Sequence, residues 1–444
     1  MSEAVERVRR AGVVGAGGAG FPTHVKLAAR VDTYIANAAE CEPLLCKDQE
    51  LMRRYAAEMV SGLRVAMEAT GASRGVIAIK KKYELAISRL RKEAGSGIDF
   101  YLYDNFYPAG DEVIIVFDVT GRLIPAGGIP LDVGCAVNNV ETLINIARAM
   151  DGIPVTHTAL TVAGAVREPL SALVPVGTSA REVLALAGGP LTDEVGLLDG
   201  GAMMGKAVLD LDAPVTKRSG GFIVLPLSHS LIRRKTQTEE AMVRISRSAC
   251  DQCSYCTELC PRYLLGYAIE PHKVMRAVGF DGERELGWSQ LGLQCCECGV
   301  CDLYACPEDL PPKDMCIRGK RLFRALPEQP EPLPNRGGPH PMRDSRRIPI
   351  PRLVERLGLR DWDVHAPMTD RVPTPSRVQL LLSQHVGAPA QPVVSSGTRV
   401  RAGELVAEVP EGQLGAPVHA SIDGTVERIE KDSIWVEADH GGRA

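Results

Sequence analysis

Two runs of closely spaced cysteines constrain this 444-residue chain more than any other feature. A cubane 4Fe–4S cluster needs four thiolates at its corners, and in two-cluster ferredoxins the cysteine before a proline ligates the other cluster. The runs read Cys250-x2-Cys253-x2-Cys256-x3-Cys260-Pro261 and Cys295-x2-Cys298-x2-Cys301-x4-Cys306-Pro307. They predict two 4Fe–4S clusters with swapped fourth ligands. The expected sets are Cys250, Cys253, Cys256 with Cys306, and Cys295, Cys298, Cys301 with Cys260.

The alternatives for these cysteines are structural zinc and disulfides. Structural zinc usually takes two separated pairs of ligands, and nothing in the sequence marks the oxidising compartment that disulfides need. The second run has x4 where x3 is usual, and an extra thiol, Cys296, stands beside a ligand position. Cys296 could replace Cys295 as a ligand, although only Cys295 keeps the spacing.

Charge and hydropathy exclude several classes of protein. The net charge of −4 predicts no global attraction to nucleic acid or to anionic membranes. No run of about 18 apolar residues is present, and residues 1–10 are too polar for a signal peptide. The sequence therefore predicts a soluble, cytoplasmic protein without a transmembrane segment, with roughly two to four domains.

A glycine-rich stretch near the start of the chain, residues 15–23, reads Gly-Ala-Gly-Gly-Ala-Gly-Phe-Pro-Thr. We call it the glycine loop. Glycines at this density let backbone N–H groups approach a phosphate, and the N-terminus of the helix predicted at 24–30 favours the negative charge. A simple turn is the alternative interpretation. The loop is therefore a candidate phosphate site.

Strands alternate with helices through the first third of the chain. Strands are predicted at 33–37, 76–79 and 100–103, and helices at 47–70, 82–92 and 140–150. This alternation predicts a wound α/β domain of largely parallel strands. Ligands of such sheets bind at the carboxyl ends of strands, where the glycine loop and the polar segment 37–43 are expected. Asn138 and Asn139 fit either that site or a helix N-cap.

Three segments, 15–23, 37–43 and 138–142, together resemble the flavin site of the NADH-binding flavoprotein subunit of respiratory complex I. The RnfC and PduS families related to that subunit are still more similar, over nearly the whole chain. The resemblance implies FMN as a cofactor and NADH as electron donor. It places the FMN phosphate on Gly15, Gly17, Gly18 and Gly20, with further flavin contacts from Lys26, Asn37, Glu40, Asn138 and Asn139. It also implies that Phe21 and Glu42 lie near the nicotinamide nucleotide and that Glu112 lies in an acidic loop over the flavin.

The chain departs from that family at two points. Ala39 stands where the family's flavoprotein often has Asp, and Leu27-Ala28 replace an aromatic residue that follows the lysine. That aromatic side chain would stack on adenine. NADH is therefore a weaker expectation than FMN.

The same resemblance implies a five-part organisation. A C-terminal barrel of this kind is similar to biotinyl and lipoyl carriers, yet its hairpin at 410–419 has no lysine, so a scaffold or docking role is expected. Its place after the cysteine runs follows the PduS order, whereas in RnfC it precedes the flavin domain. The predicted parts are a Rossmann-like FMN- and NADH-binding domain (1–153), an SLBB β-grasp domain with its connection (154–235), a helical ferredoxin-like two-cluster domain (236–326), a Pro- and Arg-rich linker (327–375) and a barrel-sandwich hybrid (376–444).

These features predict an electron-transfer oxidoreductase in which FMN converts the hydride of NADH into single electrons for the clusters. The PduS-like order implies cobalamin as acceptor in a propanediol-utilisation microcompartment, with an adenosyltransferase and a shell protein as candidate partners. The alternative is an RnfC-like peripheral subunit of a membrane ion-translocating NADH/ferredoxin complex. A non-enzymatic assembly factor is a third hypothesis, against which the intact glycine loop and the paired Asn138 and Asn139 argue.

Overall fold

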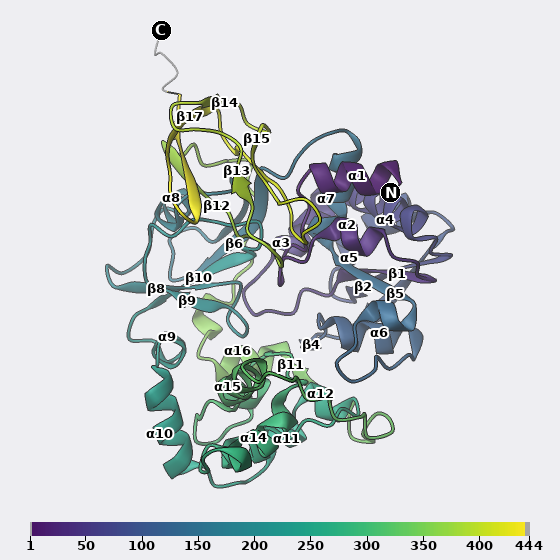
Figure 1. Ribbon diagram of the computed structural model, residues 1–444, viewed down its shortest axis with the longest axis vertical. Helices are drawn as coiled ribbons and strands as arrows, with labels where there is room; N and C mark the ends of the chain where they lie inside the picture. The colour runs from purple at the N-terminus through teal and green to yellow at the C-terminus, as the bar shows by residue number, and fades with distance from the viewer. Residues whose placement is uncertain (1, 440–444) are drawn as a thin grey trace.

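The computed structural model describes residues 2–439 and shows a mixed α/β chain built from several packed units (Figure 1). The N-terminal unit holds a parallel sheet in the order β3-β2-β1-β5. Its strands are β1 (Thr33–Ala38), β2 (Arg74–Lys80), β3 (Ile98–Tyr103) and β5 (Cys135–Asn139). All strands predicted here from the sequence are present.

Both faces of this sheet are covered, which explains why its strands are apolar almost throughout. Tyr34 and Ile77 pack against α4 (Ala56–Thr70), α5 (Glu84–Ala94) and α7 (Val140–Met150) on one face. Ile35 and Val76 pack against α6 (Glu112–Thr120) on the other. The strand order reverses between β1 and β5, and such a switch point opens a crevice at the carboxyl ends of the strands.

The single helix predicted at 47–70 is two helices, α3 (Lys47–Arg54) and α4. Tyr55 leaves the helical region with φ −120° and ψ 36°. Its N–H still bonds to Leu51 O and its carbonyl accepts from Met59 N. The break therefore bends the chain without ending the buried face that the apolar periodicity predicted.

The second unit is a five-stranded mixed sheet in the order β7-β6-β10-β8-β9. A helix, α8 (Ala180–Leu186), packs on one face and begins at a capping box of Ser179 and Glu182. We call it the five-stranded unit. The strands are β6 (His157–Gly164), β7 (Leu170–Pro175), β8 (Val195–Asp199), β9 (Lys206–Val208) and β10 (Gly221–Pro226).

The cysteine runs lie in a helical module at the bottom of Figure 1. Its helices are short because glycines and prolines interrupt them. They are α10 (Glu239–Ala249), α11 (Tyr255–Glu258), α12 (Pro261–Leu264), α13 (Pro271–Ala277), α14 (Glu283–Ser289) and α15 (Pro312–Arg324), with α9 (Ser230–Lys235) leading in.

Residues 327–375, whose composition predicts a linker, pack along other parts of the protein. Strand β11 (Ile348–Pro349) pairs antiparallel with β4 (Phe106–Tyr107) of the N-terminal unit. Arg343 forms an ion pair of 2.6 Å with the buried Asp118 of α6, and α16 (Ile350–Arg356) buries Leu353. The segment is a strap that holds the cysteine module against the N-terminal unit.

The C-terminal barrel consists of two sheets, β12-β18-β17-β14 and β13-β15-β16, around a core that includes Val378, Val406 and Val436. Residues 440–444 of the predicted domain lie outside the described part. The strands are β12 (Arg377–Leu381), β13 (Gln391–Pro392), β14 (Arg399–Val400), β15 (Leu405–Glu408), β16 (Val418–His419), β17 (Gly424–Ile429) and β18 (Ser433–Ala438). Between residues 2 and 439, every helix falls short of the length and hydropathy needed to cross a membrane.

Candidate functional site

The glycine loop folds back on itself next to the first turn of α7. Gly15 N donates to Phe21 O at 2.9 Å, and Ala16 N donates to Thr142 Oγ1 at 3.0 Å. Gly17 has φ +74°, which favours glycine, and a Cβ added at Gly18 would meet no atom within 4 Å. The loop thus offers exposed backbone and open space at the switch point, as a bound phosphate requires. The helix that it contacts is α7, whereas the sequence pointed to the short α2 (Thr23–Leu27) that follows it.

The two asparagines at the end of β5 have protein partners. Asn139 is the N-cap of α7: its Oδ1 accepts from Glu141 N at 2.9 Å, and its Nδ2 donates to Asp48 Oδ2 at 2.7 Å. Asn138 is buried and donates to the hydroxyl of Tyr34 at 3.0 Å. The N-cap interpretation is therefore confirmed for Asn139. Flavin contact by either side chain stays a prediction.

Lys26 and Phe21 lie beside β5, and Asn37 lies near the end of the neighbouring strand β1. Lys26 Nζ donates to the carbonyl of Val137 in β5 at 2.9 Å and lies 5.9 Å from the ring centre of Phe21. Burial lowers the pKa of Lys26, and the nearby carboxylate of the exposed Glu112 opposes that shift. Asn37 Nδ2 donates to Gly110 O at 2.9 Å. The structure thus places Lys26 next to Phe21 and Asn37 on the adjacent strand, and their contacts with a flavin stay a prediction.

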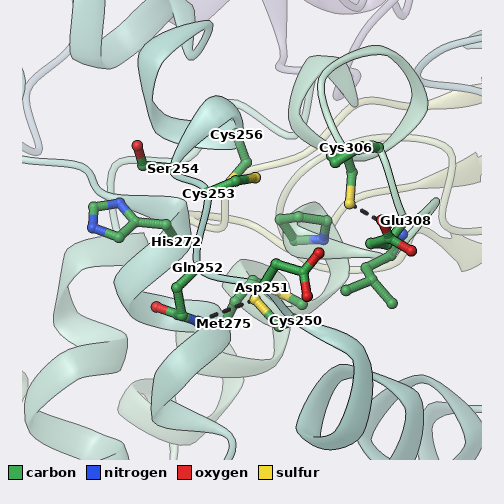
Figure 2. A pocket seen from close by; sticks show the side chains of 13 residues that line it. Cys250, Asp251, Gln252, Cys253, Ser254, Cys256, His272, Met275, Cys306 and Glu308 are labelled. Carbon is green, nitrogen blue, oxygen red and sulfur yellow. Dashed lines mark hydrogen bonds between the residues drawn. The ribbon is translucent and has the colours of Figure 1, made fainter.

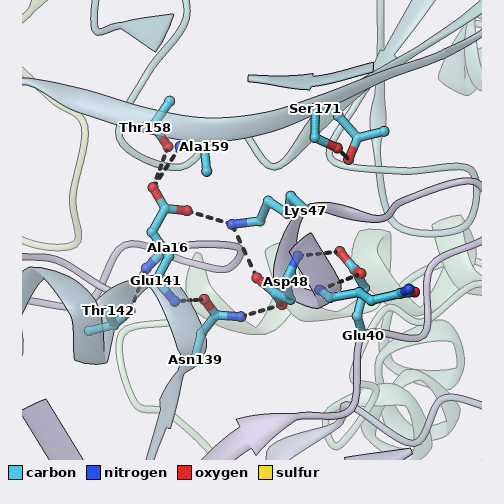
Figure 3. Close-up of polar contacts among 12 residues, drawn as sticks. Ala16, Glu40, Lys47, Asp48, Asn139, Glu141, Thr142, Thr158, Ala159 and Ser171 are labelled. Carbon is cyan, nitrogen blue, oxygen red and sulfur yellow. Dashed lines mark hydrogen bonds and ion pairs between the residues drawn. The ribbon is translucent and has the colours of Figure 1, made fainter. Parts of the chain in front are cut away.

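Glu40 lies next to the start of α3 (Figure 3). Its carboxylate oxygens accept from Asp48 N at 3.1 Å and Gln49 N at 3.4 Å, two of the amide groups that a helix start leaves free. Burial, and after it the charge of Asp48, raise the pKa of Glu40 to about 8. Glu40 therefore stabilises the start of α3, and its contact with a flavin stays a prediction.

A buried ion pair joins three elements behind the glycine loop, as Figure 3 shows. Lys47 Nζ lies 2.5 Å from Glu141 Oε2 and 3.6 Å from Asp48 Oδ1. The other oxygen of Glu141 accepts from Thr158 Oγ1 at 3.0 Å and from Ala159 N at 2.8 Å. The pair therefore connects α3, α7 and β6, and sequence reasoning did not find it.

Glu42 anchors a loop of the five-stranded unit. Its two carboxylate oxygens accept from Met203 N at 2.7 Å and Met204 N at 2.9 Å. Burial raises the pKa of Glu42, and these two amides oppose the shift. A Cβ at Gly201, which has φ +114°, would lie 2.6 Å from Glu42 Oε2. Only glycine fits there, and the role of Glu42 beside a nicotinamide stays a prediction.

Four cysteines from both runs line one hollow in the cysteine module, shown in Figure 2. Gln252 Nε2 donates to Cys250 Sγ at 3.0 Å, and Leu310 N donates to Cys306 Sγ at 3.3 Å. Within the described residues no group of three or more His, Cys, Asp or Glu side chains is placed to hold a single metal ion. A hollow bordered by thiols fits a cluster. The first cysteine set is Cys250, Cys253, Cys256 and Cys306.

The second cysteine set, Cys260, Cys295, Cys298 and Cys301, is surrounded by additional thiols. The thiol of Cys298 lies next to that of Cys296, and the thiol of Cys295 lies next to that of Cys316. Cys260, from the first run, is buried next to Cys296 and Cys295. The arrangement fits the swapped ligand set, with either Cys295 or Cys296 as its ligand from that pair.

Tyr107 connects the crevice to the second cysteine set. It is buried, and its hydroxyl donates to the carbonyl of Cys298 at 2.6 Å. The carboxylate of Glu42 lies near the same side chain. A second link is the ion pair of 2.8 Å between Asp111 and Arg262, which follows Cys260-Pro261. The crevice and the cysteine module therefore share a fixed interface, which no local sequence signal predicted.

Comparisons with known proteins match the units separately. Residues 8–148 match the model of the Nuo51 FMN-binding domain, residues 249–311 that of a 4Fe–4S dicluster domain, and residues 364–440 that of the RnfC barrel sandwich hybrid domain. These matches confirm the predictions of FMN, 4Fe–4S clusters and a barrel-sandwich hybrid.

Full-length relatives are also found. Proteins named cobalamin reductase PduS, from Citrobacter freundii and Salmonella typhimurium, are each 48% identical over 97% of this chain and 95% of their own length. A component of the proton-translocating ferredoxin:NAD(+) oxidoreductase complex of Clostridium ljungdahlii is 34% identical over 60% of this chain and 57% of its own. A crystal structure of an air-oxidised NAD+-reducing NiFe hydrogenase shares the fold, with a TM-score of 0.51 and 21% identity over 74% of this chain and 67% of that one.

Proposed function

Because the chain belongs to the PduS family of cobalamin reductases, we propose that it transfers electrons from NADH, by way of FMN and two 4Fe–4S clusters, to a corrinoid. Bound FMN would supply the conversion of a hydride into single electrons, and the clusters would supply one-electron carriers. The observation that supports this most is the fixed interface at Tyr107, which joins the crevice to the second cysteine set.

The residues of this chain would divide the work as follows. The glycine loop and the first turn of α7 would bind the phosphate of FMN, and Lys26 and Asn37 would border the flavin. The two cysteine sets would hold the clusters. Tyr107 and the Asp111–Arg262 pair would keep the crevice and the cysteine module at a constant separation.

We assign the finer domain description in the same way. One helix on a mixed five-stranded sheet supports an SLBB β-grasp fold for residues 154–235. The flavin domain would span 1–153, the dicluster domain 236–326 and the barrel 376–444, with the strap between the last two. A cytoplasmic protein of a propanediol-utilisation microcompartment, with an adenosyltransferase or a shell protein as partner, fits the family.

The RnfC-like alternative is less well supported. The matched Clostridium ljungdahlii protein is covered over only 57% of its length, whereas the PduS proteins are covered over 95%. We therefore favour a corrinoid over a ferredoxin as the partner in electron exchange.

The proposed function is tested directly by comparing a corrinoid and a ferredoxin as electron acceptors. After anaerobic reconstitution, NADH should reduce hydroxocobalamin at least about tenfold faster than a ferredoxin, followed by absorbance of each acceptor. A double variant lacking Cys250 and Cys295 should keep NADH-dependent flavin bleaching and lose most cobalamin reduction. Cys135→Ala, a buried thiol outside both cysteine sets, is the control. Preferential reduction of ferredoxin would favour the RnfC-like function.

Gly18→Val tests the phosphate site. Because an added Cβ meets no protein atom within 4 Å and the position lacks a positive φ, the variant should fold normally. The new side chain would fill the space of the phosphate, so we expect the Kd for FMN to rise at least about hundredfold, which is about 2.7 kcal/mol.

Gly97→Val is the matched control, since Gly97 also lacks neighbours within 4 Å and a positive φ. Flavin fluorescence quenching measures the affinity of both variants. Unchanged FMN affinity of Gly18→Val would show that the glycine loop is a simple turn and does not bind the phosphate.

A further inference from the structure

The glycine loop has an outer wall built from two distant parts of the chain, residues 216–219 and 384–386. Arg218 Nε donates to Gly18 O at 3.3 Å, and Val386 N of the barrel donates to Gly20 O at 3.1 Å. A Cβ at Gly20, which has φ +75°, would lie 2.8 Å from Arg218 Cδ and 2.9 Å from Gln384 O. The wall therefore closes tightly over the end of the loop.

Lys217 fixes this wall to three units at once. Its side chain is buried, and its Nζ donates to Gly12 O at 2.9 Å and to Pro417 O at 2.8 Å. Its backbone N donates to Gln384 Oε1 at 2.9 Å. Burial lowers the pKa of Lys217 to about 7, and in residues 2–439 no carboxylate forms an ion pair with it. Such a costly burial places the neighbouring Arg218 at a defined position.

The guanidinium of Arg218 is available to an anion. The side chain is exposed, and within the described residues only its Nε has a hydrogen-bond partner. The nearby carboxylate of Asp199 accepts from Ser219 Oγ at 3.2 Å. Burial raises the pKa of Asp199 and the charge of Arg218 opposes that shift, but the two groups do not come within ion-pair distance. A guanidinium presents a planar set of N–H donors that matches phosphate oxygens.

We propose that Arg218 binds a phosphate of the nucleotide on the glycine loop and that the barrel positions it there. The inference rests on the proposed function, because it requires a nucleotide at this loop. Two anionic groups are candidates for this contact, the phosphate of FMN and the pyrophosphate of NADH, because both present phosphate oxygens. The barrel, for which the sequence predicted a scaffold or docking role, would thereby complete the nucleotide site.

Arg218→Ala is the direct test in the full-length protein. We expect about a tenfold rise in the Kd for FMN, from fluorescence quenching, if Arg218 binds the flavin phosphate. A tenfold rise in the NADH concentration that half-saturates flavin bleaching, with the FMN Kd unchanged, would assign Arg218 to the NADH pyrophosphate. Either effect should weaken with salt.

Arg218→Lys should retain part of the affinity, and Arg401→Ala, an exposed barrel arginine without an ion pair among residues 2–439, should have no effect.

Gln384→Ala separates positioning from folding. It removes the acceptor of the Lys217 N–H, so it should weaken the same ligand by a smaller factor at an unchanged thermal midpoint. If the unaltered protein binds FMN but Arg218→Ala binds FMN and NADH within twofold of it, the inference is wrong and the proposed function stands. If Arg218→Ala and Gln384→Ala both lower the thermal midpoint together with the nucleotide affinity, the wall only stabilises the fold and does not bind the ligand. An unaltered protein that binds neither nucleotide would overturn the proposed function and this inference together.

Discussion

Replacing Cys306 by alanine should remove the cluster of the first cysteine set and spare the other. Cys306 belongs to the second run of the sequence, yet it lines the hollow with Cys250, Cys253 and Cys256. Loss of one of four thiolate ligands should empty that site, so iron and acid-labile sulfide should each fall from about eight to about four per chain. Cys260→Ala should remove the other cluster, because Cys260 lies beside Cys295 and Cys296.

Double variants identify which cysteines share a cluster. Cys253→Ala combined with Cys306→Ala should lose no more iron than either change alone, since both act on one site. Cys253→Ala combined with Cys260→Ala should lose nearly all of it. Cys135→Ala should retain the full content. The opposite pattern, with Cys253 and Cys260 behaving as one site, would show that each run closes its own cluster.

Lys47→Met should destabilise the N-terminal unit by about 3–5 kcal/mol, because removing one partner leaves buried charge unpaired. Burial, the largest single influence, lowers the pKa of Lys47, but the neighbouring carboxylates of Glu141 and Asp48 together outweigh it, so the pKa is raised. Both side chains are nearly inaccessible, at 4% and 6%. Hydrogen exchange of the α7 amides measures the effect on this unit alone, since several domains rarely unfold in one transition.

Lys81→Met is the matched control. Lys81 pairs with Asp104 at 2.8 Å, but both side chains are more than half exposed, so the cost should be below about 1 kcal/mol. Adding Glu141→Gln to Lys47→Met should restore part of the loss, because a neutral amide needs no cation. Equal effects of Lys47→Met and Lys81→Met would contradict the role given to the buried pair.

Local patterns allowed much of the fold to be predicted. The helix at 140–150 could be predicted to the residue because Asn139 caps it and its apolar face repeats at helical spacing. The two-cluster ferredoxin pattern predicted that Cys306 belongs with Cys250, Cys253 and Cys256, and these four side chains line one hollow; their role as cluster ligands stays a prediction. The bend at Tyr55 and the shift from α2 to α7 were missed, because tertiary contacts decide both.

Long-range pairs account for what the sequence left out. Lys47 and Glu141 are 94 residues apart and look like ordinary helix-surface charges in the sequence. The composition of the strap predicted a linker. Nothing in the sequence near Arg343 indicates that Asp118, 225 residues away, is its partner. The sequence around Tyr107 did not indicate its contact with Cys298 either, because the hydroxyl reaches that carbonyl only where two units pack together.

The outer wall of the glycine loop can form only late in the synthesis of the chain. A ribosome that adds roughly 5–20 residues per second would release Val386 roughly 20–70 s after Gly20, the residue whose carbonyl it bonds. During that interval the early parallel sheet can form, but its loop stays open on one side. If the wall completes the nucleotide site, tight FMN binding would come late in biogenesis, and a nascent chain stalled before residue 384 should present a folded sheet that releases the flavin readily.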